Sequence, residues 1–236
     1  GMESFQDADS TSSCVIIGKK AGADLNGTGA NGTIAIGFEA LKVHTGARNT
    51  AIGFGAMNDT DHHADTLASI DNIFIGYDAG GGTWSTNDCN YNTGIGNYSM
   101  DAAMNGAVNN TGVGYGTLSA LTTGVYNTVV GSAAGIDLTT GSNNVAVGRN
   151  ALLLVTTGDS NIAIGTHALD AADGSENDNI AIGYDAMGNA NNDATQHNIV
   201  MGNYAGDAFG TAAVEGTVLI GHSAGSAMNG ADDSYQ

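Results

Sequence analysis

The sequence lacks proline altogether and is poor in cysteine and basic residues: its 236 residues include 2 Cys and 5 Lys+Arg against 24 Asp+Glu. A chain without proline or a Gly-X-Y period is not a collagen, and two cysteines cannot form the framework of a disulfide-rich miniprotein. The formal net charge of −19 opposes binding to nucleic acid or anionic lipid, because that affinity comes from Lys and Arg. No stretch reaches the roughly 18 apolar residues of a membrane span. We therefore expect neither nucleic-acid binding nor direct membrane insertion.

Glycine, in contrast, is abundant, and twelve glycines end copies of one short repeat. Typical copies read Asn-Thr-Ala-Ile-Gly at 49–53 and Asn-Ile-Ala-Ile-Gly at 161–165, and successive copies lie 16 to 23 residues apart. The repeat glycines are Gly18, Gly37, Gly53, Gly76, Gly96, Gly114, Gly131, Gly148, Gly165, Gly183, Gly202 and Gly221. Repetition at this period indicates a solenoid. We predict a single all-β domain over 1–236, with about twelve coils over 14–227. An N-terminal segment (1–13), whose leading Gly is typical of a tag scar, and a C-terminal tail (228–236) flank the coils.

The residues before each repeat glycine alternate as in a β-strand. Three before it stands a β-branched residue, and one before it stands Ile, Val or Met. These two positions share one face of the strand, because side chains alternate with a period of two. We expect this face to line the interior of a parallel β-solenoid.

The position two before each glycine points to the opposite face and carries no charged or polar residue. A strand that is apolar on both faces is normally buried on both, whereas a single coil has only one interior. We therefore predict that this column is an interface between copies of the chain. Its members are Ile16, Ala35, Ala51, Phe74, Gly94, Gly112, Val129, Ala146, Ala163, Ala181, Val200 and Leu219.

Two further columns flank the strand. Nine of the twelve copies carry Asn four residues before the glycine, and stacked Asn side chains can form amide ladders along a solenoid. The glycine itself is expected to take a positive φ at the strand end. Three residues after it, ten copies carry Ala. This column predicts a second short wall, which the pattern leaves open between a strand and one helical turn.

The motif Asn-(Thr/Ile)-Ala-Ile-Gly-x-x-Ala-(Leu/Met) resembles the head repeats of YadA-like trimeric autotransporter adhesins, over essentially 14–227. Similar repeats occur in bacteriophage tail fibres. The resemblance implies a left-handed parallel β-roll, three chains side by side, and exposure at the tip of a surface fibre. It would make the column two before glycine a trimer interface. The steps here are longer and less even than those of the adhesin repeat, and the chain has no heptad stalk or membrane anchor.

Catalysis has little support in the sequence. A hexapeptide-repeat acyltransferase, which also has about 18 residues per coil, is the enzyme alternative. Only one hexad per coil fits that pattern, and the uneven steps argue against it. No Gly-x-Ser-x-Gly elbow occurs. We predict no enzyme, no catalytic residue and no cofactor.

The two longest steps, Gly53–Gly76 and Gly76–Gly96, are adjacent. Insertions in a solenoid map to loops on one face, which is often the binding face. The candidate ligand residues of these loops are His62, His63, Trp84, Asp88 and Tyr91. Trp84 is a plausible platform for a sugar or protein ligand, because aromatic side chains dominate contact hot spots. The alternative is that Trp84 folds back to cap its own loop.

Metal and disulfide chemistry are weaker possibilities. Asp59, Asp61 and Asp65 offer hard oxygen ligands that suit calcium, although they match no EF-hand, and a solvated acidic loop is favoured. Cys14 and Cys89 precede repeat glycines four coils apart. At the ~4.8 Å spacing of stacked strands they lie roughly 19 Å apart, beyond the ~7 Å that a disulfide tolerates. We therefore predict no intrachain disulfide.

The sequence thus predicts a non-enzymatic segment of a homotrimeric fibre outside a cell or virion. It would serve as an adhesion or receptor-binding head for a host surface protein or glycan, or as a rigid spacer. A phage tail-fibre segment in host recognition is the alternative. Ice binding ranks lower, because its threonine row (Thr50, Thr93, Thr111 and Thr128) is expected to face the interior, and metal binding ranks with it.

Overall fold

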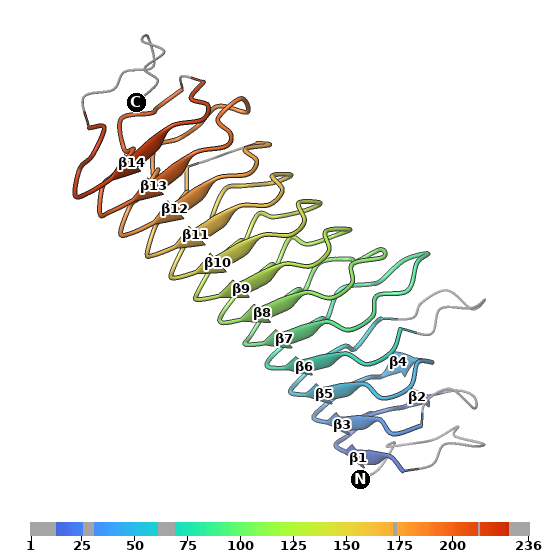
Figure 1. The fold of residues 1–236 in the computed structure, drawn as a ribbon. Coiled ribbons are helices and arrows are strands. Elements are labelled where there is room, and N and C mark those ends of the chain that lie inside the picture. Colours follow the sequence, from blue (N-terminus) through green and yellow to red (C-terminus); the bar gives the residue numbers. More distant parts are fainter. Residues whose placement is uncertain (1–12, 26–30, 61–68, 172–173, 212, 227–236) are drawn as a thin grey trace. The chain divides into compact units, whose positions relative to one another are not determined.

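The computed structural model describes residues 13–25, 31–60, 69–171, 174–211 and 213–226. The chain is an all-β parallel β-solenoid of about 11 turns, and none of the described residues forms a helix (Figure 1). Two compact units make up the chain, unit 1 over Gly1–Thr123 and unit 2 over Gly124–Gln236. The predicted fold class is confirmed at this level.

Unit 1 contains a parallel sheet in which each three-residue strand directly precedes a repeat glycine. Its strands are β1 (Val15–Ile17), β3 (Ile34–Ile36), β5 (Thr50–Ile52), β6 (Ile73–Ile75), β7 (Thr93–Ile95) and β8 (Thr111–Val113). Consecutive strands pair with the motifs in register, so that Ile34 lies beside both Val15 and Thr50. A short second sheet pairs β2 (Asp24–Leu25) with β4 (Val43–His44).

Unit 2 repeats this arrangement with more even coils. Its strands are β9 (Thr128–Val130), β10 (Val145–Val147), β11 (Ile162–Ile164), β12 (Ile180–Ile182), β13 (Ile199–Met201) and β14 (Val218–Ile220). All neighbouring pairs are parallel and in register, as the Ala146–Ala163 and Ala163–Ala181 pairs show. Figure 1 shows these six strands stacked in chain order.

The predicted orientation of the strand faces is wrong. The residues two before glycine point into the solenoid: Ala35, Ala51, Phe74, Val129, Ala146, Ala163, Ala181 and Val200 are fully buried within a single chain. Gly94 and Gly112 are buried with them, and the two end members, Ile16 in the first strand and Leu219 in the last, are partly accessible. The β-branched residues on either side of this column point outward instead. The column predicted as a trimer interface is therefore the core of each unit.

The second wall of the core consists of turns rather than a helix. The small residue three after the glycine is fully buried in most coils, as in Ala40, Ala151 and Ala186, and so is the following Leu or Met where one is present. This following residue takes a left-handed backbone conformation, with φ of 54° at both Leu152 and Met187. Buried alanines on both walls leave only a thin interior between them.

Two large side chains fill the core where the coils are longest. Phe74 occupies the space beside Gly94, where an added Cβ would lie 2.5 Å from the Phe74 ring. Trp84 packs edge-to-face on Phe74, with ring centroids 5.8 Å apart. A longer coil encloses more volume, and these rings occupy it at the density that protein interiors require.

The repeat glycines are required by both conformation and space. Gly148 has a φ of 138° and Gly165 a φ of 137°, a region that residues with a Cβ seldom enter. A Cβ on Gly148 would lie 2.4 Å from the carbonyl oxygen of Gly165, and one on Gly165 would lie 2.2 Å from that of Gly183. Each such glycine with a coil stacked on it thus allows that coil to approach closely, and the predicted positive φ is confirmed.

The predicted asparagine ladder is confirmed in both units. In unit 2, the Oδ1 of Asn161 accepts bonds from the backbone N–H of Asn179 (3.1 Å) and from its amide Nδ2 (3.3 Å). The Asn161 Nδ2 donates to the Glu176 carbonyl at 2.7 Å. The ladder asparagines are fully buried, and these bonds satisfy polar groups whose burial would otherwise be costly.

Replacing a repeat glycine should destabilise the chain far more than replacing a glycine that only has a positive φ. We expect Gly148→Ala to lower the unfolding free energy by about 3 kcal/mol or more, because strain and overlap with a neighbouring backbone add. Gly216 has a φ of 66° with no atom within 4 Å of an added Cβ, so Gly216→Ala should cost only about 1 kcal/mol. Urea unfolding followed by circular dichroism measures both, and equal losses would contradict the close-approach argument.

Breaking the ladder should cost more than removing an exposed asparagine that makes a similar bond. We expect Asn161→Ala to destabilise the protein by about 3 kcal/mol, because the Asn179 N–H and the Glu176 carbonyl lose buried partners. Exposed Asn203 accepts one backbone bond from Tyr184 at 3.0 Å. Water can replace it, so Asn203→Ala should cost less than about 1 kcal/mol. Hydrogen exchange at the Asn179 amide would show directly whether its protection is lost.

Candidate functional site

The outward face of the sheet is the first candidate surface, and its residues are those three and one before each repeat glycine. In unit 1 they are Val15, Ile34, Thr50, Ile73, Thr93 and Thr111 in one row, and Ile17, Ile36, Ile52, Ile75, Ile95 and Val113 in the other. In unit 2 they are Thr128, Val145, Ile162, Ile180, Ile199 and Val218, with Val130, Val147, Ile164, Ile182, Met201 and Ile220.

This outward face is apolar and partly open to solvent. Accessibility reaches 40% at Ile73, 37% at Ile164 and 71% at Ile220, and no charged residue lies in either row. Monomeric soluble proteins rarely expose large contiguous apolar patches, and those that occur mark interaction sites. β-Branched side chains on short strands in register make the surface even along each unit, which suits contact with another regular surface.

The predicted ligand loop does not present its tryptophan. Trp84 is 1% exposed and packs in the core against Phe74, so its ring is unavailable to a surface ligand. Its indole Nε1 has no hydrogen-bond partner among the described residues. Asp88 lies exposed, and Tyr91 is exposed at a left-handed corner with a φ of 61°. His62 and His63 lie outside the described residues.

The metal candidates are also only partly described. Asp59 is half-buried and accepts a hydrogen bond from the Thr83 hydroxyl at 2.8 Å, whereas Asp61 and Asp65 lie outside the described residues. Within the described ranges, no three His, Cys, Asp or Glu side chains gather as a metal site would require. In the same ranges, no helix is long and apolar enough to cross a membrane.

No disulfide joins Cys14 and Cys89, as predicted. The buried Cys89 accepts a hydrogen bond from the Gly106 N–H at 3.3 Å and contacts the Asn87 carbonyl at 3.6 Å. Its sulfur is therefore part of the hydrogen bonding between two coils of unit 1.

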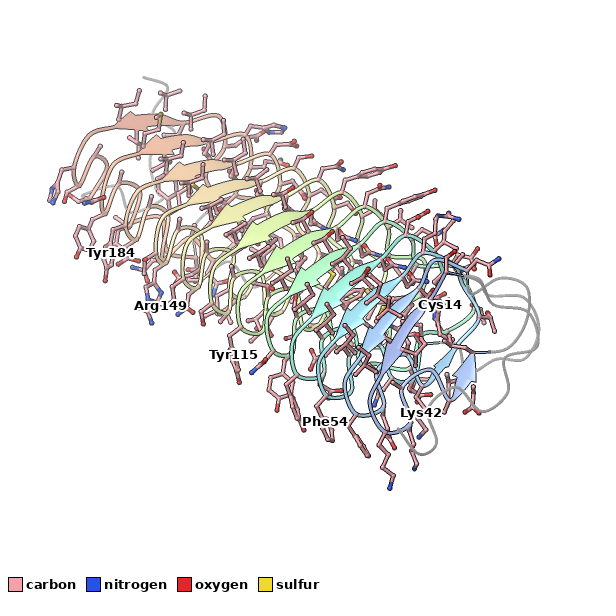
Figure 2. The ribbon with its side chains drawn as sticks, turned by 90° about the horizontal axis from the view of Figure 1, so that it is seen from below. Cys14, Lys42, Phe54, Tyr115, Arg149 and Tyr184 are labelled. Atoms are coloured by element: carbon pink, nitrogen blue, oxygen red, sulfur yellow. The ribbon has the colours of Figure 1, made fainter. Side chains whose placement is uncertain are left out.

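A row of aromatic rings in unit 1 is a second candidate surface, which the sequence analysis missed. Phe38, Phe54, Tyr77 and Tyr115 directly follow repeat glycines, and Tyr98 stands one position later. Successive centroids lie 4.9, 5.3, 5.3 and 5.8 Å apart. Figure 2 shows Phe54 and Tyr115 projecting from the ribbon along one edge of the unit. The recurrence of an aromatic just after the glycine was the available signal.

Unit 2 has a corresponding row at the same corner, with histidine and arginine neighbours. Tyr184 and Tyr204 lie 5.3 Å apart, and His167 and His222 flank them at 6.3 and 5.9 Å. The His167 ring hydrogen-bonds to the Asp170 carboxylate, and its other nitrogen lies 2.9 Å from the Arg149 guanidinium. Figure 2 places Arg149 and Tyr184 along one edge of this unit.

Carboxylates lie beside both ring rows. Partial burial raises the pKa of Asp78 and of Asp101 in unit 1, and proximity to Asp78 raises the pKa of Asp101 further. In unit 2, burial and the nearby carboxylates of Asp170 and Asp207 raise the pKa of Asp185, while His167 lowers it. These corners therefore hold negative charge that is poorly solvated.

Neither a protein-family model, nor a curated protein, nor a solved structure matches the chain. Two surfaces of the described residues are candidates for contact with another molecule, the outward face and the ring rows.

The raised pKa of Asp101 makes stability depend on pH. The Asp101 pKa in the unfolded state is near the ordinary 3.8, and burial raises it in the folded state. At a pH between these two pKa values, the folded state therefore binds more protons than the unfolded state does. Stability should therefore rise as the pH falls from neutral through the folded-state pKa, and then level off below the unfolded value. We expect Asp101→Asn to raise stability at neutral pH and to flatten this dependence. Asp88→Asn, the same charge change on an exposed loop, should preserve the slope. Urea midpoints across the acidic range test this, and unchanged slopes in both variants would contradict it.

Proposed function

We propose that this chain is a non-enzymatic segment of a homotrimeric surface fibre, formed as a left-handed β-roll, that acts outside a cell or virion. It serves as an adhesion or receptor-binding head, or as a rigid spacer, and its ligand is a host surface protein or glycan. The observation that carries this proposal is the outward face, where two uncharged rows of Ile, Val and Thr remain accessible in a single chain.

Burial of the outward face would be favourable. Each large aliphatic side chain that leaves water contributes about 1.5–3 kcal/mol when it becomes fully buried. These residues are already partly covered, so the gain per residue is smaller, but it recurs in every coil. Acidic residues lie in the loops rather than in these rows, so association does not bring carboxylates together within the contact.

A second copy of the chain is the partner that best fits such a surface. The rows repeat with the coil spacing, and another solenoid with the same spacing offers a matching set of ridges. Closed, symmetric association is also the common arrangement for oligomers of a single chain. The resemblance of the repeat to adhesin heads supports three copies, and it supports equally a segment of a bacterial adhesin or of a phage tail fibre.

The mass in solution tests this proposal. Light scattering after gel filtration should give about 70 kDa, three times the 23.5 kDa of the chain. Ile164→Glu should lower the mass toward that of one chain, because every copy would then bring a carboxylate into an apolar contact. Thr157, exposed in a turn, provides the matched control, and Thr157→Glu should leave the mass at its wild-type value.

A wild-type mass near 23.5 kDa would overturn the proposal. The second candidate, binding of the flat face to an ordered surface such as ice, would then lead. The expectation that placed its threonines inside is wrong, since Thr50, Thr93, Thr111 and Thr128 lie in the outward rows. A thermal hysteresis measurement on the monomer distinguishes this candidate from a solenoid whose face is covered by some other partner.

A further inference from the structure

The ring row of unit 1 changes character at Tyr77. Phe38, Phe54 and Tyr77 stack nearly parallel, with interplanar angles of 19° and 10°. From Tyr77 onward the rings alternate, at 65° to Tyr98 and 81° from Tyr98 to Tyr115. Edge-to-face packing leaves more of a ring face uncovered than parallel stacking does. Tyr77 is 44% exposed and Tyr115 is 57% exposed.

Two carboxylates accompany these three tyrosines. Asp78 follows Tyr77 directly. Partial burial raises the pKa of the Tyr98 phenol, and the neighbouring Tyr77 and Tyr115, with smaller contributions from Asp78 and Asp101, raise it further. The Asp78 carboxylate lies over the backbone, where a Cβ on Gly81 would be 2.3 Å from its Oδ1. Within the described residues, neither carboxylate forms an ion pair. The patch thus combines exposed ring faces with two partly desolvated negative charges.

We propose that Tyr77, Tyr98, Tyr115, Asp78 and Asp101 form a docking surface for a basic segment of a partner protein, rich in Lys or Arg. Ring faces attract ammonium and guanidinium groups through their quadrupole. A partly desolvated carboxylate gains more from an arriving cation than a fully solvated one does. The net charge of −19 adds long-range attraction for a basic partner. This inference rests on the proposed receptor-binding role and names the class of ligand for it. The binding of a basic segment to the patch can be measured whether or not the chain is a trimer.

Unit 2 shows the same corner with an arginine of its own. Tyr184 and Asp185 stand at the positions of Tyr77 and Asp78, one and two residues after their repeat glycines. There, the Arg149 guanidinium lies 2.9 Å from the His167 ring, which packs edge-to-face on Tyr184. A cation of the chain itself thus lies at this corner, whereas Asp78 and Asp101 in unit 1 form no ion pair within the described residues. The two corners provide a matched pair within one protein.

The experiment titrates the full chain with a fluorescent oligolysine peptide at physiological ionic strength and measures the Kd by anisotropy. Asp78→Asn combined with Asp101→Asn should raise the Kd about threefold to tenfold, and Tyr77→Ala should raise it by a similar factor. The matched variants Asp185→Asn and Tyr184→Ala should leave the Kd within about twofold of wild type. Circular dichroism and light scattering on each variant establish that the fold and mass are unchanged.

Three outcomes would overturn this inference. Equal weakening by the unit 1 and unit 2 variants would show general attraction to an acidic protein rather than a docking site. A Kd for oligolysine that changes in neither the unit 1 nor the unit 2 variants would exclude the patch as its binding site. If Tyr77→Ala abolishes specific binding of a neutral oligosaccharide while oligolysine binding persists, the patch is a glycan surface instead. A monomeric wild type that still binds oligolysine through the patch would overturn the proposed trimer but not this site.

Discussion

The close approach of consecutive coils at the repeat glycine is the constraint on which the rest of each unit depends. Where another coil stacks on the repeat glycine, as at Gly37, Gly148 and Gly165, a Cβ would lie within 2.6 Å of the carbonyl of the next glycine. With this backbone conformation, a side chain at this corner would therefore push the next coil away from sheet spacing. The asparagine ladder depends on the same spacing, because one Oδ1 must reach both the backbone N–H and the amide of the next coil, as Asn161 does to Asn179. Each of these contacts recurs in every regular coil, so a small stabilising free energy per coil adds up to a large one over the unit.

Close stacking of the coils leaves a thin interior. The thin interior explains why the prediction that placed the β-branched rows inside and the small residues outside was wrong. Alternation showed that the residues on either side of Ala163 share one face and that Ala163 has the other, but a period of two does not say which face is inside. The assignment relied on β-branched residues packing in the core. Here two walls approach closely, so the interior accepts Ala163 and Ala186, while Ile162 and Ile164 lie outside. Volume, rather than hydrophobicity, decided the orientation, because both faces are apolar.

The register of the repeat, its glycines and its asparagine ladder could be predicted because each depends on contacts between equivalent positions. The candidate site could not be predicted in the same way, because it depends on which side chains pack inside each coil and which project into solvent. Trp84 lies in the core because a long coil beside Gly94 needs the volume that Trp84 and Phe74 supply. The glycine-rich loop left both an exposed and an inward-folded Trp84 open, because the sequence does not show the volume that each coil encloses. The rings at Phe54 and Tyr77 stand in the same column, directly after the repeat glycine, so their stacking was open to prediction from the register of the repeat.

The two exposed surfaces of the chain differ in their chemistry, and this difference suggests a division of roles. The outward face has no charge, so it gains from any contact that removes it from water and discriminates little between apolar partners. The ring corners carry aromatic faces and carboxylates, which attract one sign of charge and penalise the other. An acidic chain that presents its uncharged face to copies of itself keeps its charged corners at the periphery of the assembly. In such an arrangement, each copy would repeat the same tyrosine and aspartate patch, and several weak contacts of one kind would combine into stronger binding of a partner that carries several basic segments.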